Sequence, residues 1–157
     1  MSKVKNYMMR SLNSVCQHDE VEGVIRLMHK IERSVLPVVD DENTFLGTIY
    51  IQNILKNIIP ERYGFLDINK FIYERNQAAE NLNNIKGKKV KDYMSKKVIS
   101  VKEDESMDDM ASIIIKNKES YLYVVNKEDK LRGYISRADL LYYLLEVGEE
   151  GDESRRD

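Results

Sequence analysis

The sequence predicts a mixed α/β fold, α+β in layout, in which two copies of one βαββα unit are related by a pseudo-twofold axis. The first observation that predicts it is an internal repeat, because a shift of 86 residues places Val4 on Val90 and keeps its register without a gap as far as Ile59 on Leu145. The second is the series of hydrophobic patterns, which has the same order in both copies. The third is a strand in each copy whose two faces are both apolar, so we expect the two sheets to pack face to face.

The repeat pairs residues of similar character along the whole unit. The sequence VKNYM at the start of the first copy aligns with VKDYM in the second, and GTI at 47–49 aligns with GYI at 133–135. The aligned apolar sets are Val21, Val24, Ile25 and Met28 with Met107, Met110, Ala111 and Ile114, and Ile54, Leu55, Ile58 and Ile59 with Leu140, Leu141, Leu144 and Leu145. A match of this length is improbable by chance, so the chain contains a duplicated unit of about 56 residues.

Each copy is predicted to contain a short lead-in helix, a brief extended segment, an amphipathic helix, two strands joined by a polar turn, and a closing helix. In the first copy the predicted bounds are 4–8, 13–16, 20–31, 35–39 and 45–50, followed by the closing helix. In the second copy they are 90–94, 98–101, 107–118, 121–125 and 131–135, again followed by a closing helix. The longer helices repeat apolar residues at i, i+3, i+4 and i+7, and Ser106 is predicted to be the N-cap of the second of them.

The chain is expected to divide into a first unit at 1–59, a linker at 60–89, a second unit at 90–147 and a flexible tail at 148–157. The linker is longer than a simple connection needs and has apolar positions of its own, which predict an extra helix over 67–83. That helix either covers apolar surface or guards a ligand cleft or a dimer face. The tail lacks apolar content, so we expect it to fray.

The composition argues against several classes of function. The 25 basic and 27 acidic residues nearly cancel to a net charge of −2, so we expect no nucleic-acid partner. One cysteine, Cys16, excludes an internal disulfide, and with only two histidines, His18 and His29, we expect no metal site. No apolar run approaches the length of a membrane span and the N-terminus lacks a signal core, so we expect a cytoplasmic protein.

The segment from Gly133 to Asp139, with the sequence GYISRAD, is where a strand is predicted to lead directly into a helix. Ser136 is placed to be the N-cap of that helix, and Asp139 follows at the spacing of a capping box. Taken alone, this pattern is structural. It gains a functional interpretation because the same pattern occurs in the first copy, from Gly47 to Asn53.

The duplicated pattern resembles a tandem pair of cystathionine-β-synthase (CBS) domains, often called a Bateman module. The resemblance rests on SVLPVVD at 34–40 and GYISRAD at 133–139, and it covers nearly all of 4–147 apart from the linker. It implies two symmetry-related clefts, each built from both units. In the family motif the serine or threonine and the free amides of the helix start hold a phosphate oxygen, and the aspartate accepts hydrogen bonds from both ribose hydroxyls.

The resemblance implies that one of the two clefts is competent to bind a ligand. Its expected residues are Ile135, Ser136, Arg137 and Asp139 from the second unit and Asn13, Ser14, Arg33, Ser34, Val35 and Leu36 from the first. The other cleft is expected to combine Tyr50 and Asn53 with Ile99, Ser100, Ser120, Tyr121 and Leu122. Tyr50 and Asn53 stand where the motif has serine or threonine and aspartate, so we expect that second cleft to be degraded. Arg137 is expected to be a counter-charge for the phosphate.

These features favour a ligand-sensing regulatory module that binds an adenine nucleotide (AMP, ADP or ATP) or a related adenosyl compound such as S-adenosylmethionine. The alternative is a ligand-free dimerisation or scaffold module. A third hypothesis is a nucleotide hydrolase that uses the acidic run at 102–109 and a metal ion, but no nucleophile–base set or phosphate-binding loop supports it, so we expect neither an enzyme nor a catalytic cofactor.

The resemblance also implies a homodimer that pairs through helical faces and acts on a downstream protein which the sequence does not identify. The residues expected on these faces are Val21, Val24, Met28, Ile54, Ile58, Met107, Met110, Ile114, Leu141, Tyr142 and Leu145.

Overall fold

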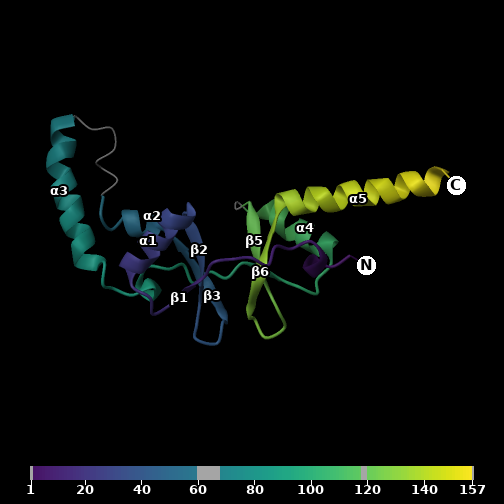
Figure 1. The fold of residues 1–157 in the computed structure, drawn as a ribbon, viewed down its shortest axis with the longest axis horizontal. Helices are drawn as coiled ribbons and strands as arrows, with labels where there is room; N and C mark the ends of the chain where they lie inside the picture. Colours follow the sequence, from purple (N-terminus) through teal and green to yellow (C-terminus); the bar gives the residue numbers. More distant parts are fainter. Residues whose placement is uncertain (1, 60–67, 118–119, 157) are drawn as a thin grey trace. The chain divides into compact units, whose positions relative to one another are not determined.

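A computed structural model describes residues 2–59, 68–117 and 120–156 of the chain. It contains two three-stranded sheets, one of order β1-β2-β3 and one of order β4-β5-β6, each with its own helices (Figure 1). The mixed α+β class and the duplicated βαββα order predicted from the sequence are confirmed. The chain divides into two compact units, which we name after their sheets the β1–β3 unit and the β4–β6 unit.

The β1–β3 unit comprises Asn13–Asp41 and Leu46–Val98. Its elements are β1 (Val15–Cys16), α1 (Val21–Ile31), β2 (Val35–Val39), β3 (Phe45–Tyr50, of which Phe45 falls in the other unit), α2 (Ile51–Leu55), α3 (Ile68–Ile85) and the 3-10 helix η3 (Val90–Asp92). Strand β1 pairs in parallel with β2, with Val15 opposite Val38.

The β4–β6 unit comprises Met1–Leu12, Glu42–Phe45 and Ile99–Asp157. Its elements are the 3-10 helix η1 (Val4–Asn6), β4 (Ser100–Lys102), α4 (Met107–Lys116), β5 (Tyr121–Val125), β6 (Leu131–Ser136) and α5 (Arg137–Arg156). Strand β5 pairs in parallel with β4 and antiparallel with β6. The predicted N-cap of α4 is confirmed, because the Ser106 hydroxyl accepts a hydrogen bond of 3.1 Å from the Asp109 amide.

Each unit has a core in which the amphipathic helix packs on its sheet. In the β1–β3 unit the buried set is Val15, Val21, Val24, Met28, Leu36, Val38, Ile49, Ile54, Ile58 and Val90. In the β4–β6 unit it is Val4, Met8, Val101, Met107, Met110, Ile114, Leu122, Val124 and Ile135. The helical stripes expected on a dimer face are therefore core positions instead, and of that expected set only Leu141, Tyr142 and Leu145 are exposed. The sequence pattern identified an apolar helix face but not which partner covers it.

Each lead-in segment packs in the core of the other repeat. Val4 and Met8, from the first repeat, pack with the core of the β4–β6 unit, and Val90, from the second repeat, packs with the core of the β1–β3 unit. The backbone bonds are equivalent in the two cases, since the Val4 amide donates to the Glu105 carbonyl and the Val90 amide donates to the Asp19 carbonyl, both at 2.9 Å. The compact units therefore contain different sets of residues from the sequence repeats.

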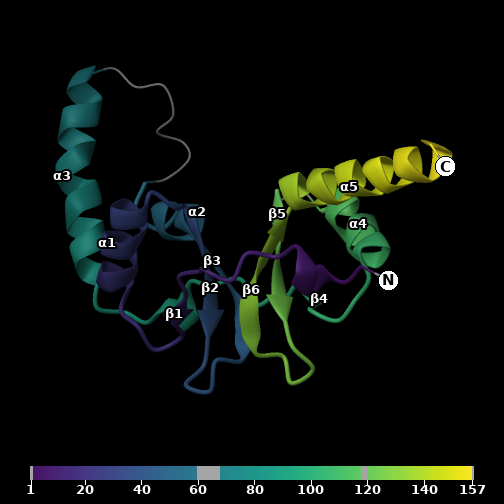
Figure 2. The ribbon, with the colours of Figure 1, turned by 45° about the vertical axis from the view of Figure 1, so that its right-hand side comes forward.

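The linker contains the extra helix predicted for it, because α3 spans Ile68–Ile85 and runs alongside α1 in both Figure 1 and Figure 2. Ala78, Leu82 and Ile85 pack against the core of the β1–β3 unit, so this helix covers apolar surface. Residue 67, where the predicted helix begins, lies outside the described residues.

The last helix is longer than the sequence predicts. α5 continues to Arg156, through the segment 148–156 that was expected to fray. No proline interrupts this segment, and Glu149 and Glu150 are good helix formers that extend a helix already begun on the core. Figure 2 shows α5 running past the end of α4.

Candidate ligand site

The junction between β6 and α5 is built as predicted from Ser136 and Asp139. Strand β6 ends at Ser136 and α5 begins at Arg137. The Asp139 Oδ2 accepts hydrogen bonds from the Ser136 backbone amide at 2.8 Å and from the Ser136 hydroxyl at 3.0 Å, while the Asp139 amide lies 3.2 Å from the same hydroxyl oxygen. These reciprocal bonds form the predicted capping box and fix the orientation of the carboxylate.

Asp139 is largely buried, with 9% of its surface exposed, and Thr48 is the other buried polar side chain within the described part of the chain. The bonds of the capping box use one carboxylate oxygen, Oδ2. Within residues 2–59, 68–117 and 120–156, no donor bonds to Oδ1, and no fully buried polar side-chain atom lacks a partner. Asp139 therefore combines a fixed orientation with one acceptor oxygen that remains available.

The guanidinium of Arg137 binds the end of a neighbouring helix. Its Nη2 donates to the Asn117 carbonyl at 2.7 Å and lies 3.5 Å from the Ile114 carbonyl, both at the C-terminal end of α4. A positive charge is favourable there because carbonyls at the end of a helix lack partners in the helix. The sequence did not reveal this contact, because it joins two helices that are more than twenty residues apart.

The other predicted residues in this unit lie at the same end of the sheet, where β4 and β5 begin and β6 ends. Ile135 is fully buried in the core opposite Leu122, so only its backbone is available to a ligand. The Ser120 carbonyl accepts a hydrogen bond of 3.1 Å from the Arg137 amide. Ile99, Ser100 and Tyr121 are half-buried, and Ser120 is exposed.

Comparison with known proteins identifies the repeat. A family model described as the CBS domain matches residues 4–60 and again residues 90–146. The chain belongs to the CBS domain family.

The chain is similar to three proteins that differ in how much of their length it covers. Protein MJ1426 of Methanocaldococcus jannaschii is 30% identical over 142 residues, which make up 83% of this chain and 84% of that protein. Inosine-5'-monophosphate dehydrogenase of the same organism is 27% identical over 141 residues, 90% of this chain but only 23% of the dehydrogenase. CBSX2 of Arabidopsis thaliana, in its crystal structure in complex with AMP, has a TM-score of 0.67 at 21% identity over 94% of this chain and 99% of that chain.

The first CBS repeat builds its strand-to-helix junction differently. Tyr50 precedes α2 as its N-cap residue without a capping bond from its side chain. Asn53, at the position of Asp139, donates from Nδ2 to the Tyr93 carbonyl at 3.1 Å. The backbone carbonyl of Asn53 accepts a hydrogen bond from the side-chain amide of Asn57. The amide of Asn53 therefore holds the end of η3, a role that needs a donor.

The remaining predicted residues of the first CBS repeat lie at the N-terminal ends of β1 and β2. Asn13, Ser14, Arg33 and Ser34 are exposed, Val35 is half-buried, and Leu36 belongs to the core. The Ser34 carbonyl accepts a hydrogen bond of 2.9 Å from the Ile51 amide, the counterpart of the bond between Ser120 and Arg137. The backbone at this end of the sheet thus makes the same hydrogen bond in both CBS repeats.

The described residues contain no group of side chains suited to binding a metal ion. Across the ranges that the structure covers, no three His, Cys, Asp or Glu side chains are grouped to hold a metal ion. Cys16 lies 3.5 Å from Asp41 Oδ1 through its sulfur, and both histidines are exposed. None of the helices in the described part of the chain has the length and apolarity needed to cross a membrane.

Proposed function

We propose that this CBS pair is a ligand-sensing regulatory module that binds an adenine nucleotide or a related adenosyl compound through Ser136 and Asp139. The observation that supports it most directly is the Asp139 carboxylate, which is largely buried and oriented by two bonds to Oδ2 while Oδ1 accepts none from the described residues. A capping box on its own requires only the first of these oxygens. The second oxygen has lone pairs for two hydroxyl donors.

Vicinal ribose hydroxyls fit this acceptor. Two adjacent O–H donors can share one carboxylate oxygen, and hydrogen bonds to an ionised acceptor are shorter and stronger than neutral ones. The start of α5 adds the positive end of the helix dipole, which favours a phosphate. The complex of CBSX2 with AMP supports the choice of an adenosyl compound.

The proposal also assigns roles to residues of the first CBS repeat. Asn13, Ser14, Arg33, Ser34, Val35 and Leu36 would contact the base and complete the site with Ile135 and Arg137. Arg137 keeps further N–H groups for a phosphate beside the Nη2 that binds the end of α4. Asn53 supports a single competent site, because its amide is already bonded to the Tyr93 carbonyl. The site built on Tyr50 and Asn53 would therefore not bind.

The test is calorimetric titration with AMP, ATP and S-adenosylmethionine of the wild-type protein and Asp139→Asn. The asparagine carbonyl can accept both capping bonds, so the fold is kept, but a donor replaces the free acceptor Oδ1. We expect affinity for the preferred compound to fall by at least about tenfold, the loss expected for hydrogen bonds to a charged group.

Asp109→Asn is the matched control, since Asp109 occupies the equivalent position at the start of α4 and is exposed. It should bind as the wild type does. The sensor function is refuted if the wild-type protein binds none of the three compounds, which would leave the scaffold alternative, or if Asp139→Asn binds as tightly as the wild type.

A homodimer is part of the proposal. Leu141, Leu144 and Leu145 of α5 are 51–64% exposed, and they lie at spacings that place them on one helix face. A contiguous exposed apolar face is typical of an association surface.

A further inference from the structure

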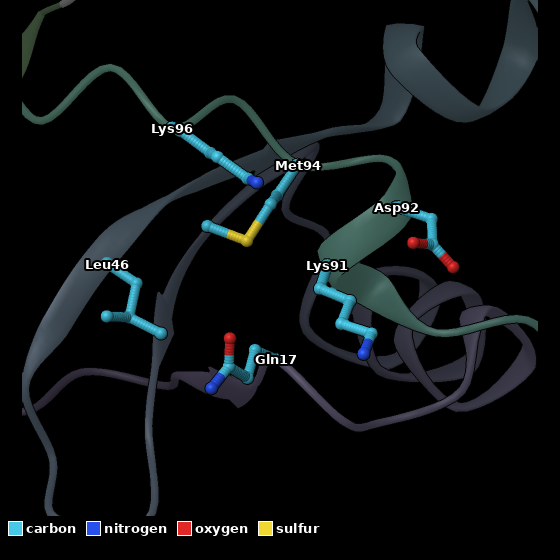
Figure 3. A pocket seen from close by; sticks show the side chains of 6 residues that line it. All are labelled: Gln17, Leu46, Lys91, Asp92, Met94 and Lys96. Carbon is cyan, nitrogen blue, oxygen red and sulfur yellow. The ribbon is translucent and has the colours of Figure 1, made fainter.

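The β1–β3 unit contains a hollow that is lined by none of the residues assigned to the proposed ligand site. Its volume is about 270 Å³, and it is lined by Gln17, Leu46, Lys91, Asp92, Met94 and Lys96. Figure 3 shows Met94 and Lys96 reaching over it from one side, with Leu46 and Gln17 bordering it from the other. Every lining residue belongs to the same compact unit.

The hollow is at one end of the strands, and the residues aligned with Ser136 and Asp139 are at the other end. Gln17 directly follows the C-terminal end of β1, and Leu46 lies at the start of β3. Tyr50, which aligns with Ser136, is at the far end of β3. A ligand in this hollow would therefore contact none of the residues assigned above to the adenosyl compound.

The duplicated repeat provides an internal comparison for this corner of the sheet. In the β4–β6 unit the equivalents of Gln17, Leu46 and Lys91 are Glu103, Arg132 and Lys5. The backbone is the same in both, since the amides of Lys5 and Lys91 donate at 3.0 Å to the carbonyls of Glu103 and Gln17 respectively. Differences between the two corners therefore come from their side chains.

In the β4–β6 unit the corresponding side chains form ion pairs. Arg132 Nε lies 3.2 Å from Glu103 Oε2, and Lys5 Nζ lies 3.2 Å from Asp104 Oδ1. The hydrogen bond from Lys5 lowers the pKa of Asp104, with a smaller contribution from the charge of Lys5. Lys5 and Arg132 thus each have a carboxylate partner within the unit.

In the β1–β3 unit the same partners are neutral. Gln17 replaces Glu103, His18 replaces Asp104 and Leu46 replaces Arg132, while the lysine is kept as Lys91. Across the described ranges, the side chains of Lys91, Lys96 and Gln17 make no hydrogen bond or ion pair. Asp92 is the one carboxylate among the six lining residues, against two ammonium groups. The corner keeps Lys91 at the position of Lys5, but neutral residues stand where Glu103 and Asp104 pair with cations in the other unit.

We propose that this hollow binds a small phosphate monoester, with the phosphate between Lys91 and Lys96 and the organic part against Leu46 and Met94. Lysine offers a compact charge that suits a tetrahedral phosphate, whereas a planar carboxylate is better matched by the fork of an arginine, which this corner lacks. Gln17 adds an amide donor, and the leucine and thioether offer an apolar wall. The volume is just below the usual range for small-molecule sites, so the organic group is small.

The experiment is an NMR titration of the full chain with phenyl phosphate, observing the methyl groups of Met94 and Leu46. We expect saturable shifts of both, with about tenfold weaker binding in Lys91→Gln and in Lys96→Gln, because each removes one charge-assisted hydrogen bond. Inorganic phosphate should bind more weakly because it lacks the apolar part, and benzoate more weakly because it carries a single planar charge. Equal binding of benzoate would overturn the assignment to phosphate.

Three further variants test whether binding occurs in this hollow. Gln17→Glu combined with Leu46→Arg rebuilds the ion pair of the other unit and should abolish the shifts without unfolding the protein, since the same pair is accommodated in the β4–β6 unit. Lys30→Gln removes an exposed charge elsewhere in the same unit, and it should leave binding unchanged, as should Asp139→Asn. Shifts that do not saturate, or that Lys30→Gln or Asp139→Asn weakens as much as the two lysine variants do, would refute the site.

Discussion

Single side chains separate the two CBS repeats more sharply than their backbones do. Asp139 and Asn53 occupy equivalent positions, but one accepts bonds that cap its own helix and the other donates to the carbonyl of Tyr93. A carboxylate cannot make that second bond because it has no donor. Aspartate at this position leaves one acceptor oxygen that a ligand could use, whereas asparagine uses its amide for a hydrogen bond inside the protein.

Another residue-scale contact joins the lead-in segment to α5. The Tyr7 hydroxyl donates to Glu146 Oε2, and the ring packs edge-on against Tyr143 with centroids 5.3 Å apart. The hydrogen bond to Glu146 raises the pKa of Tyr7, and desolvation and the charge of Glu146 add to the effect. The folded state therefore favours the protonated phenol more than the unfolded state does.

A Tyr7→Phe variant should change how stability depends on alkaline pH. Because the pKa is raised on folding, the contribution of Tyr7 is complete below the unfolded value of about 10 and is lost as the pH rises through the folded value. Urea unfolding from about pH 8 to 11 should show a steeper fall for the wild type than for Tyr7→Phe. Tyr142→Phe, which changes an exposed tyrosine on the same helix, is the control. Parallel curves for wild type and Tyr7→Phe would contradict the prediction.

At the scale of secondary-structure elements, the repeated glycines are explained by a crossing of backbones. The chain at Met9 exchanges two hydrogen bonds with Tyr134, at 2.8 and 2.9 Å, and the chain at Ser95 does the same with Thr48. A Cβ on Gly133 would lie 2.1 Å from the Met9 carbonyl oxygen, and one on Gly47 would lie 2.1 Å from that of Ser95. Gly47 also has a φ of 154°, which disfavours other residues. The glycine of each motif thus admits the segment that crosses the strand.

Gly133→Ala should lower the free energy of unfolding by about 1–3 kcal/mol, the cost typical of overpacking, because the obstructing atom is backbone and cannot turn aside. Gly23→Ala is the matched control, since its Cβ would meet nothing within 4 Å and it lies inside α1. That change should raise stability by roughly 0.5–1 kcal/mol through helix propensity. Denaturant unfolding measures both. Equal stabilities for Gly133→Ala and the wild type would contradict the prediction, because they would mean that the backbone at Met9 moves aside at little cost.

At the scale of the whole molecule, α5 carries an exposed apolar face that is available for association. The stripes of α1 and α4 are buried within their units, so they are not available to a second chain. Leu141 and Leu145 are each 64% exposed. Exposed leucines one helical turn apart favour a partner helix of the same kind.

Sedimentation equilibrium at micromolar concentration should therefore give twice the chain mass of 18.4 kDa. Leu141→Glu combined with Leu145→Glu should shift the protein to the single-chain mass, because charges would have to be desolvated in the interface. Val98→Glu, at an apolar residue 49% exposed elsewhere in the chain, should leave the mass doubled. A wild-type protein that sediments at 18.4 kDa would contradict the homodimer.

The sequence alone determined the duplication, the order of elements and the capping box, because periodicity and capping depend on residues close together in the chain. Only the tertiary structure decided which lead-in segment enters which core, that Arg137 binds the end of α4, and that Asn53 binds η3. It also decided that Glu103 pairs with Arg132 at one corner of a sheet, while a hollow lies beside Lys91 at the duplicate corner. These outcomes depend on contacts between distant segments, and the same residue pattern is compatible with either outcome until those segments pack.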